Sequence, residues 1–288
     1  MNTLRYLTDP SLSPLYWPGV LAALALVLMC SLLSVVVVLK RLAFIGQGIS
    51  HAAFGGVGLA AIAGLAATTV AAAPFHGVPQ FLIVLGFCLG AALLIGFLSE
   101  RGAARADTVI GIVLVASMAL GAILIARSRS TLSWESFLFG SLLSVTREDA
   151  AIAWILALGT LVALWAARRS LIFWAFDEPA ARAFGVRAGA VKALLMLLLA
   201  AATVTAMKLA GVVLATALLV MPGAIALKLS ARFGAVLLLS VAAAAVAILG
   251  GIVASFELDL PTGACIVCVL TALYAITVTG TAFASSGR

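Results

Sequence analysis

The sequence predicts an all-α membrane protein, a polytopic transmembrane helical bundle of eight or nine spans that forms a single domain over residues 1–288. Hydrophobic residues make up 65% of the chain and charged residues only 9%, whereas a soluble domain is about 25% charged. Long segments contain no Asp, Glu, Lys or Arg, and a membrane-spanning helix needs about 20 apolar residues. These segments are continuous apolar runs, not the alternating strands of a membrane barrel.

Nine segments are long and apolar enough to be candidate spans. The segment 190–207 is the shortest, and Lys192 and Lys208 can extend it because long basic side chains reach from apolar surroundings to water. The first segment lacks a charged leading region and a cleavage site, so we interpret it as a retained helix. The candidate spans are 16–39, 51–71, 80–98, 108–126, 150–167, 190–207, 210–227, 234–255 and 263–283.

The net charge of +7 indicates orientation in a membrane and requires no nucleic-acid partner. In a nine-span arrangement the larger set of basic residues lies on one side, which we expect to face the cytoplasm, with the N-terminus outside and the C-terminus inside. An eight-span arrangement would change the N-terminal side. The larger set is Lys40, Arg41, Arg101, Arg105, Arg168, Arg169, Arg182, Arg187, Lys192, Lys228, Arg232 and Arg288, and the smaller set is Arg5, Arg127, Arg129, Arg147 and Lys208.

The stretch KRLAFIGQGISHAAFGGVG, residues 40–58, contains one of only two histidines in the chain. Gln47 and His51 are four residues apart and share one helix face. An ionisable residue inside a membrane indicates function, and a neutral imidazole is a common metal ligand. The competing interpretation is a satisfied core histidine. A transport path needs weak binding, so one histidine without a closed metal site suits it. The second histidine, His76, lies in a short outer turn.

The most charged stretch is the loop 166–192, expected on the cytoplasmic side. Asp177 can cap a helix and Glu178 suits its first turn. We expect a short helix over 178–184 that Gly185 ends. Such a helix between two spans is either a docking element for a partner or a solvated turn.

Five stretches in order, over residues from about 40 to 275, together resemble the metal-ion ABC permeases, the zinc, manganese and iron uptake family. More distantly, the last four spans resemble the permeases for vitamin B12 and iron-siderophores, which implies a related fold. The stretches are KRLAFIGQGISHAAFGGVG for the first motif, SFLFGSLLSVTREDA for the outer-loop motif, FDEPAARAFGV for the coupling-loop motif, GVVLATALLVMPGAIALKLSARF for the next signature and LDLPTGACIVCVL for the last.

The resemblance implies a permease of the bacterial plasma membrane that imports divalent metal ions and forms its path as a homodimer. A cytoplasmic ABC ATPase would dock on the loop through Asp177, Glu178, Ala181 and Gly185. An extracytoplasmic solute-binding protein would deliver the metal, and His51 would face it. The partner ATPase would bind ATP, and this chain would need no cofactor of its own.

One residue departs from the family's first motif, which typically has an acid where this chain has Gln47. An amide offers only a neutral oxygen, which implies weaker metal binding, a different ion or a chelated substrate. An ABC permease for a metal chelate, or for a cobalamin- or siderophore-like compound, is therefore the alternative function.

Two other classes of protein fit the sequence less well. An intramembrane enzyme using Ser50 and His51 is disfavoured, because neighbours in a helix point about 100° apart and cannot pair. The sequence has no Walker A pattern, HExxH or Gly-x-Ser-x-Gly elbow, so we expect no catalytic site in this chain. A secondary transporter would place charged relays inside its spans, where this sequence has almost none.

Overall fold

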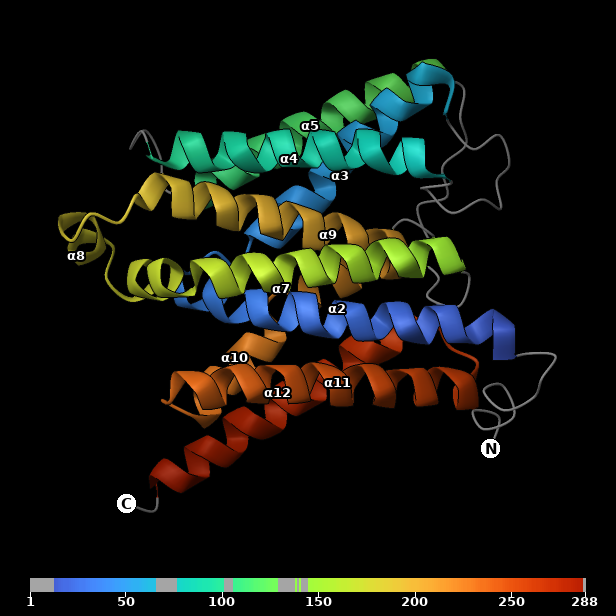
Figure 1. Ribbon diagram of the computed structural model, residues 1–288. Coiled ribbons are helices and arrows are strands. Elements are labelled where there is room, and N and C mark those ends of the chain that lie inside the picture. Colours follow the sequence, from blue (N-terminus) through green and yellow to red (C-terminus); the bar gives the residue numbers. More distant parts are fainter. Residues whose placement is uncertain are drawn as a thin grey trace.

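The structure, a computed structural model, describes residues 13–65, 77–100, 106–128, 138, 140 and 145–286, and every regular element in these ranges is helical. The predicted fold class is confirmed. Figure 1 shows the long helices lying side by side, with the short α8 at one end of the bundle. The helices are α2 (Ser13–Leu39), α3 (Ile45–Ala60) continued by the π-helical turn η1 (Ala61–Leu65), α4 (Val78–Glu100), α5 (Ala106–Ser128), α7 (Arg147–Phe176), α8 (Glu178–Ala183), α9 (Ala188–Leu218), α10 (Met221–Leu229), α11 (Phe233–Leu258) and α12 (Thr262–Ser286).

Eight helical stretches of the described chain are long and apolar enough to cross a membrane, and one of them, Ala188–Leu229, has 42 residues. A continuous helix of that length would measure about 63 Å, roughly twice the hydrocarbon core of a bilayer. The helix is interrupted at Gly211, whose φ of 83° and ψ of 168° are not helical. The chain therefore has a point at which it can reverse.

Side-chain contacts show that this stretch does reverse. α7 defines the two ends of the bundle: Asp149 at its start pairs with Lys208 of α9, and Trp174 near its end lies against Lys40, directly after α2. Beyond Gly211, Ala226 of α10 packs in a cluster with Val35, near the end of α2. The chain thus runs from the Lys40 end to the Asp149 end and back, which gives nine passages in the part of the chain that the structure describes.

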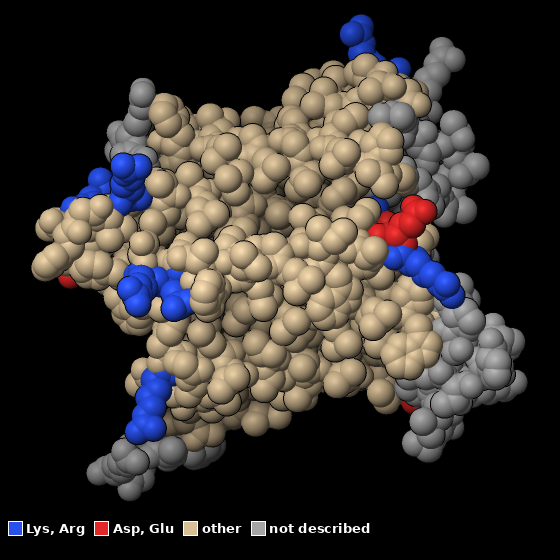
Figure 2. Space-filling view, viewed as in Figure 1, with Lys and Arg blue, Asp and Glu red and all other residues tan. Residues whose placement is uncertain are grey.

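The two ends of the bundle differ in charge, and we call the Lys40 end inner and the Asp149 end outer because basic residues favour the cytoplasmic side. Figure 2 shows charged atoms gathered at the two ends with a broad belt of other residues between them. An uncharged belt of this kind is the surface that a bilayer covers. The nine passages place the start of α2 at the outer end and the end of α12 at the inner end.

Three helices differ from their predicted bounds. The predicted spans 190–207 and 210–227 were expected to separate near residue 208, but α9 runs to Leu218 through the break at Gly211. The second predicted span was 51–71, but α3 already begins at Ile45, so Gln47 and His51 lie within its first turns. Residues 66–71 of that prediction lie outside the described residues. The fifth predicted span was 150–167, but α7 continues to Phe176. The coupling loop, expected over 166–192, is therefore reduced to the segment 177–187, which contains α8.

Candidate functional site

Gln47 and His51 lie one turn apart on α3, as their spacing predicts. The His51 Nδ1 atom lies 3.0 Å from the backbone oxygen of Gln47 and 3.5 Å from the Ser50 hydroxyl. With its proton on Nδ1, the ring donates to the Gln47 carbonyl, and Nε2 keeps its lone pair. A histidine held in this way presents one ring nitrogen as a ligand.

The face of α3 that carries these two residues is open in the single chain. Gln47 is exposed and His51 is partly exposed. Along the same helix, Phe44, Leu59 and Ile62 are large exposed apolar residues. This exposed face of α3 is mostly apolar and carries two polar side chains. Such a face is suited to contact with another helix or with another copy of the chain.

The other faces of α3 are closed by α4, α5 and α9. Glycines allow this close approach: a Cβ atom on Gly48 would lie 2.5 Å from the Ile110 side chain, and one on Gly58 would lie 3.0 Å from the backbone oxygen of Gly121. Small residues let membrane helices pack at such distances. Packing therefore fixes α3 on three sides and leaves the Gln47 and His51 strip as its free side.

The described residues contain no group of three or more His, Cys, Asp or Glu side chains that could hold a metal ion. One copy thus offers only the side chains of Gln47 and His51, and so few ligands suit passing contact with an ion better than storage. The second histidine, His76, and residues 136, 137, 139 and 141–144 of the outer-loop motif lie outside the described residues.

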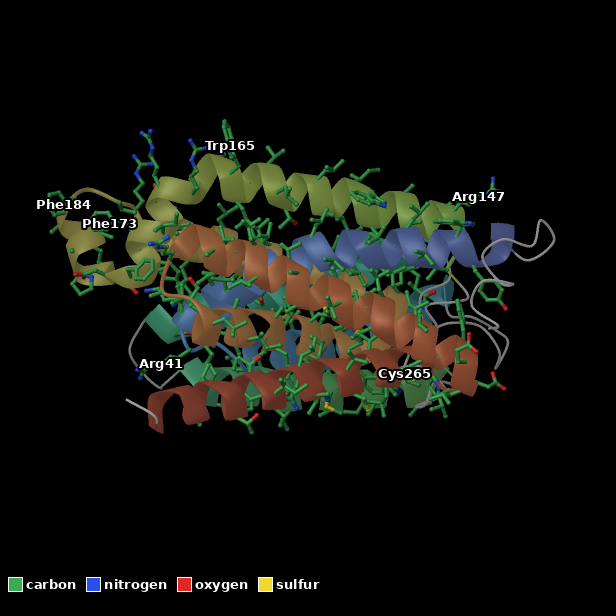
Figure 3. The ribbon with its side chains drawn as sticks, turned by 90° about the horizontal axis from the view of Figure 1, so that it is seen from below. Arg41, Arg147, Trp165, Phe173, Phe184 and Cys265 are labelled. Atoms are coloured by element: carbon green, nitrogen blue, oxygen red, sulfur yellow. The ribbon has the colours of Figure 1, made fainter. Side chains whose placement is uncertain are left out.

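The short helix α8 forms as predicted at the inner end. The Asp177 carboxylate accepts a hydrogen bond of 2.9 Å from the backbone N–H of Ala180 and caps the helix. Gly185 has a φ of 83°, the left-handed conformation that ends the helix. Ala181 is fully buried and fixes α8 to the bundle, whereas Phe184 is 80% exposed. Figure 3 shows Phe184 beyond the end of α7, with Phe173 beside it.

Glu178 is partly exposed and is held by two basic residues of the same chain. One carboxylate oxygen lies 3.3 Å from the Lys40 Nζ atom and the other lies 2.9 Å from an Arg182 nitrogen. Partial burial raises the pKa of the Glu178 carboxyl, but the hydrogen bonds and charges of Arg182 and Lys40 outweigh it and lower that pKa below its ordinary value. Glu178 is therefore ionised near neutral pH.

A shallow groove of about 450 Å³ lies beside α8 at the inner end. It is formed by the end of α7, the start of α9 and the turn after α8, including Phe184 and Gly185. Its base is apolar, and Arg187 adds a positive charge at its wall. The groove and the exposed Phe184 ring together form a surface on which a second protein can dock.

The ion pair between Lys208 and Asp149 at the outer end was not predicted from the sequence. The ammonium nitrogen lies 2.6 Å from the carboxylate, and the Lys208 side chain is 8% exposed. Sequence reasoning assigned Lys208 to the membrane surface by its length alone. The sequence signals that could have indicated this pair were an acid in the first turn of α7 and a lysine inside an apolar stretch.

The model of the ABC 3 transport family matches residues 14–281 of the chain. The chain belongs to this family. Its curated relatives include proteins named as manganese or iron transport membrane proteins. The predicted resemblance to metal-ion ABC permeases is therefore confirmed.

Two relatives and one solved structure illustrate the similarity. The manganese transport system membrane protein MntC of Halalkalibacterium halodurans is 33% identical over 278 residues, which cover 96% of this chain and 91% of MntC. A probable iron transport system membrane protein of Haemophilus influenzae is 30% identical over 258 residues, with 90% of each chain covered. A chain of PsaBC from Streptococcus pneumoniae in complex with Fab superposes with a TM-score of 0.76 at 28% identity, over 91% of this chain and 90% of that chain.

Family membership and the apolar helices make this chain a multi-pass permease of the bacterial plasma membrane. ABC permeases of this family work with an ATPase and a solute-binding protein. They are typically not catalytic themselves.

Proposed function

We propose that this chain is the permease subunit of an ATP-driven importer for divalent metal ions, with manganese as its first substrate to test. The observation that carries the proposal is the Gln47 and His51 pair on the open face of α3. This pair lies in a chain whose relatives are named for manganese and iron transport. Neither side chain carries a negative charge that would hold a cation tightly, so an ion can bind and leave.

The translocation path would form where two copies meet along their α3 strips. Two copies related by a two-fold axis would bring two Gln47 and two His51 side chains toward one axis. The exposed apolar residues on the same strip, Phe44, Leu59 and Ile62, would supply the contact between copies. Residues 1–288 would then act as one permease domain in each copy.

The cytoplasmic ATPase would dock on α8 and the groove beside it. Asp177 and Gly185 would set the two ends of α8, Ala181 would anchor it and Phe184 would enter the ATPase. ATP would be bound and hydrolysed by that separate subunit, and this chain would have no catalytic site and no cofactor of its own. The solute-binding protein would deliver the metal ion at the opposite, outer end.

Transport would follow from movement of α8. Closure of two ATPase subunits on ATP would shift both α8 helices and tilt the two permeases against each other. The Gln47 and His51 strip would then open to one side of the membrane at a time.

The test is uptake of radioactive manganese by proteoliposomes that contain the permease, its ATPase and its solute-binding protein. We expect ATP-dependent uptake of manganese. Excess iron or zinc should compete with it, and His51→Ala should lower it. An assembled complex that hydrolyses ATP but takes up no free ion would contradict the proposal. Uptake of a metal only with a chelator present would instead favour the chelate permease, which the neutral amide of Gln47 leaves as the second candidate.

A further inference from the structure

Lys40 joins three helices at the inner end of the bundle. It follows directly after α2, and its Nζ atom lies 3.3 Å from the Glu178 carboxylate of α8. The same ammonium lies 3.9 Å from the centre of the Trp174 ring, near the end of α7. Its side chain is only 15% exposed, so both contacts lie in partly desolvated surroundings. An ion pair and a cation–π contact are each stronger where water is excluded.

A rigid corner connects Lys40 to α3. The backbone N–H groups of Lys40, Arg41 and Leu42 donate to carbonyl oxygens of α2 at 2.9–3.1 Å, and that of Ile45 donates to Leu42 at 3.0 Å. Arg41 has a φ of 56°, a left-handed conformation that turns the chain sharply into α3. No flexible linker separates Lys40 from the helix that bears Gln47.

The corner and α8 also face one small cavity. A space of about 170 Å³ is lined by Lys40, Leu42 and Ile45 on one side and by Trp174 and Glu178 on the other. Apart from the Lys40 contacts, the start of α3 is therefore not tightly packed against the α7–α8 corner at this point. The Lys40 side chain is thus the direct contact between α8 and the α2–α3 corner, beside a second route through α9, which packs against both α8 and α3.

The two cations that bind Glu178 have different structural effects. Arg182 is four residues along the same helix and is 58% exposed, so its ion pair stays within α8. Lys40 comes from another part of the chain, 138 residues away in sequence. Removing Lys40 would leave α8 with its Asp177 cap and its Arg182 pair, and would remove its ionic link to the α2–α3 corner.

We propose that Lys40 is a positioning residue that couples movement of α8 to α3, through its ion pair with Glu178 and its stacking on Trp174. The inference rests on the proposed function, because it assumes that α8 receives the ATPase and that α3 lines the path. A basic residue that only orients the protein in the membrane needs no fixed partner. Lys40 has two fixed partners on two other helices.

The experiment measures metal ions taken up per ATP hydrolysed, in proteoliposomes that contain the complete complex. Lys40→Met removes the charge and keeps the apolar stem, and Lys40→Arg keeps a cation that pairs with Glu178 and stacks on Trp174. We expect Lys40→Met to lower the ratio about fivefold, the lower end of usual coupling effects, with ATP hydrolysis and complex assembly retained. Lys40→Arg is expected to keep at least half of the wild-type ratio.

The matched control is Arg168→Met. Arg168 lies over the Trp165 ring at 4.5 Å, also at the inner part of α7, but both residues are exposed, and the Arg168 side chain also donates to the Trp165 backbone oxygen within its own helix. Arg168→Met removes a cation from a tryptophan ring at the same membrane surface. We expect it to leave the number of metal ions taken up per ATP hydrolysed unchanged.

The outcomes separate the inference from the proposed function. No uptake by the wild-type complex would contradict the proposed function, whereas wild-type uptake with an unchanged ratio in Lys40→Met would overturn the coupling role alone. If Lys40→Met fails to assemble, Glu178→Gln decides, because it breaks the same ion pair and leaves Lys40 on Trp174. A normal ratio in Glu178→Gln would overturn the inference, and a lowered ratio would support it.

Discussion

The Lys208 ammonium group lies 2.6 Å from the Asp149 carboxylate, and this pair joins the outer ends of α9 and α7. Asp149 also forms a capping box with Thr146 at the start of α7. Three residues beyond Lys208, the backbone of Gly211 is in close contact with Gly140 of the outer loop, where a side chain at Gly140 would not fit. The pair therefore joins α7 to α9 close to the point where Gly140 meets the break in α9.

The Lys208 side chain is more buried than that of Asp149, so replacing one residue should change the free energy of unfolding by a different amount than replacing the other. Asp149→Asn leaves the Lys208 ammonium, 8% exposed, without its counter-charge, and we expect it to lower the free energy of unfolding by about 3 kcal/mol. Lys208→Met leaves Asp149 bonded to Thr146 and should cost about 1 kcal/mol. Denaturant unfolding of the detergent-solubilised permease measures both. Equal losses of unfolding free energy in the two variants, or a larger loss in Lys208→Met, would show that the unpaired buried ammonium is not the main cause of destabilisation.

Replacement of Gly211 by alanine should disrupt the reversal of the chain. Its φ of 83° and ψ of 168° lie in a region that only glycine occupies readily, and a side chain there costs about 1–3 kcal/mol. We expect Gly211→Ala to lower the melting temperature and metal uptake together. The control is Gly159→Ala in α7, where a Cβ atom meets no neighbour within 4 Å. A Gly211→Ala protein as stable and active as Gly159→Ala would contradict the strain argument.

Removal of the His51 imidazole should slow uptake and spare assembly. His51 is partly exposed, and its hydrogen-bonding partners, the Gln47 backbone oxygen and the Ser50 hydroxyl, belong to its own helix turn, so its loss leaves the packing of α3 intact. We expect His51→Ala to reduce the initial rate of manganese uptake about tenfold, the effect of losing roughly 1.4 kcal/mol of ion binding. The measurement pairs uptake with size-exclusion chromatography of the complex. Loss of assembly in parallel with uptake would make the histidine structural.

The exposed ring of Phe184 should carry much of the ATPase contact. Phe184→Ala is expected to weaken binding of the purified ATPase about tenfold, as truncation of an aromatic anchor does, while the melting temperature changes little. Phe176→Ala is the matched control, because Phe176 is 64% exposed on α7 and packs against Phe233 instead of the groove. Surface-immobilised permease in nanodiscs measures both affinities. Equal affinities of the two variants would place the docking surface elsewhere.

The stabilisation that Glu178 provides should depend on pH in one direction. Its pKa is lower in the folded protein than its ordinary value of 4.5, so its contribution is complete above pH 4.5 and is lost as the pH falls through the lower folded-state pKa. We expect the melting temperature of wild type to exceed that of Glu178→Gln at pH 7. The difference should shrink on acidification below pH 4.5. A difference that grows on acidification would contradict the ion pairs seen at this carboxylate.

Local features of the fold were predictable because they depend on neighbouring residues. The helix α8 follows from the Asp177 cap and the glycine at 185, and α2 follows from an uninterrupted apolar run. The start of α3 was misplaced because the sequence from 42 to 99 has no charged residue to mark where its first span begins, whereas Gly46 and Gly48 lie inside the helix and allow close packing. The end of α7 was misplaced because two arginines at 168 and 169 resemble a membrane boundary.

Contacts between distant segments were not predictable from one sequence. Lys40 and Glu178 are 138 residues apart, and no local pattern indicates that a basic residue after α2 pairs with an acid in α8. That Glu178 contacts the ATPase stays a prediction, whereas its pairs with Lys40 and Arg182 within the chain were not predicted. Gln47 and His51 were identified correctly as sharing a helix face, because a four-residue spacing fixes that relation. Which side of α3 remains open depends on the packing of α4, α5 and α9.

The break at Gly211 turns one apolar stretch into two passages and makes the number of passages in the described part of the chain odd. Because of this, the end of α12 in one copy and the start of α2 in a second copy lie on opposite sides of the bilayer. A single polypeptide containing two copies in tandem would need an additional transmembrane helix as its linker. A symmetric pair is thus most simply made by two separately synthesised chains that meet in the membrane, and any engineered single-chain version must add a tenth passage between its halves.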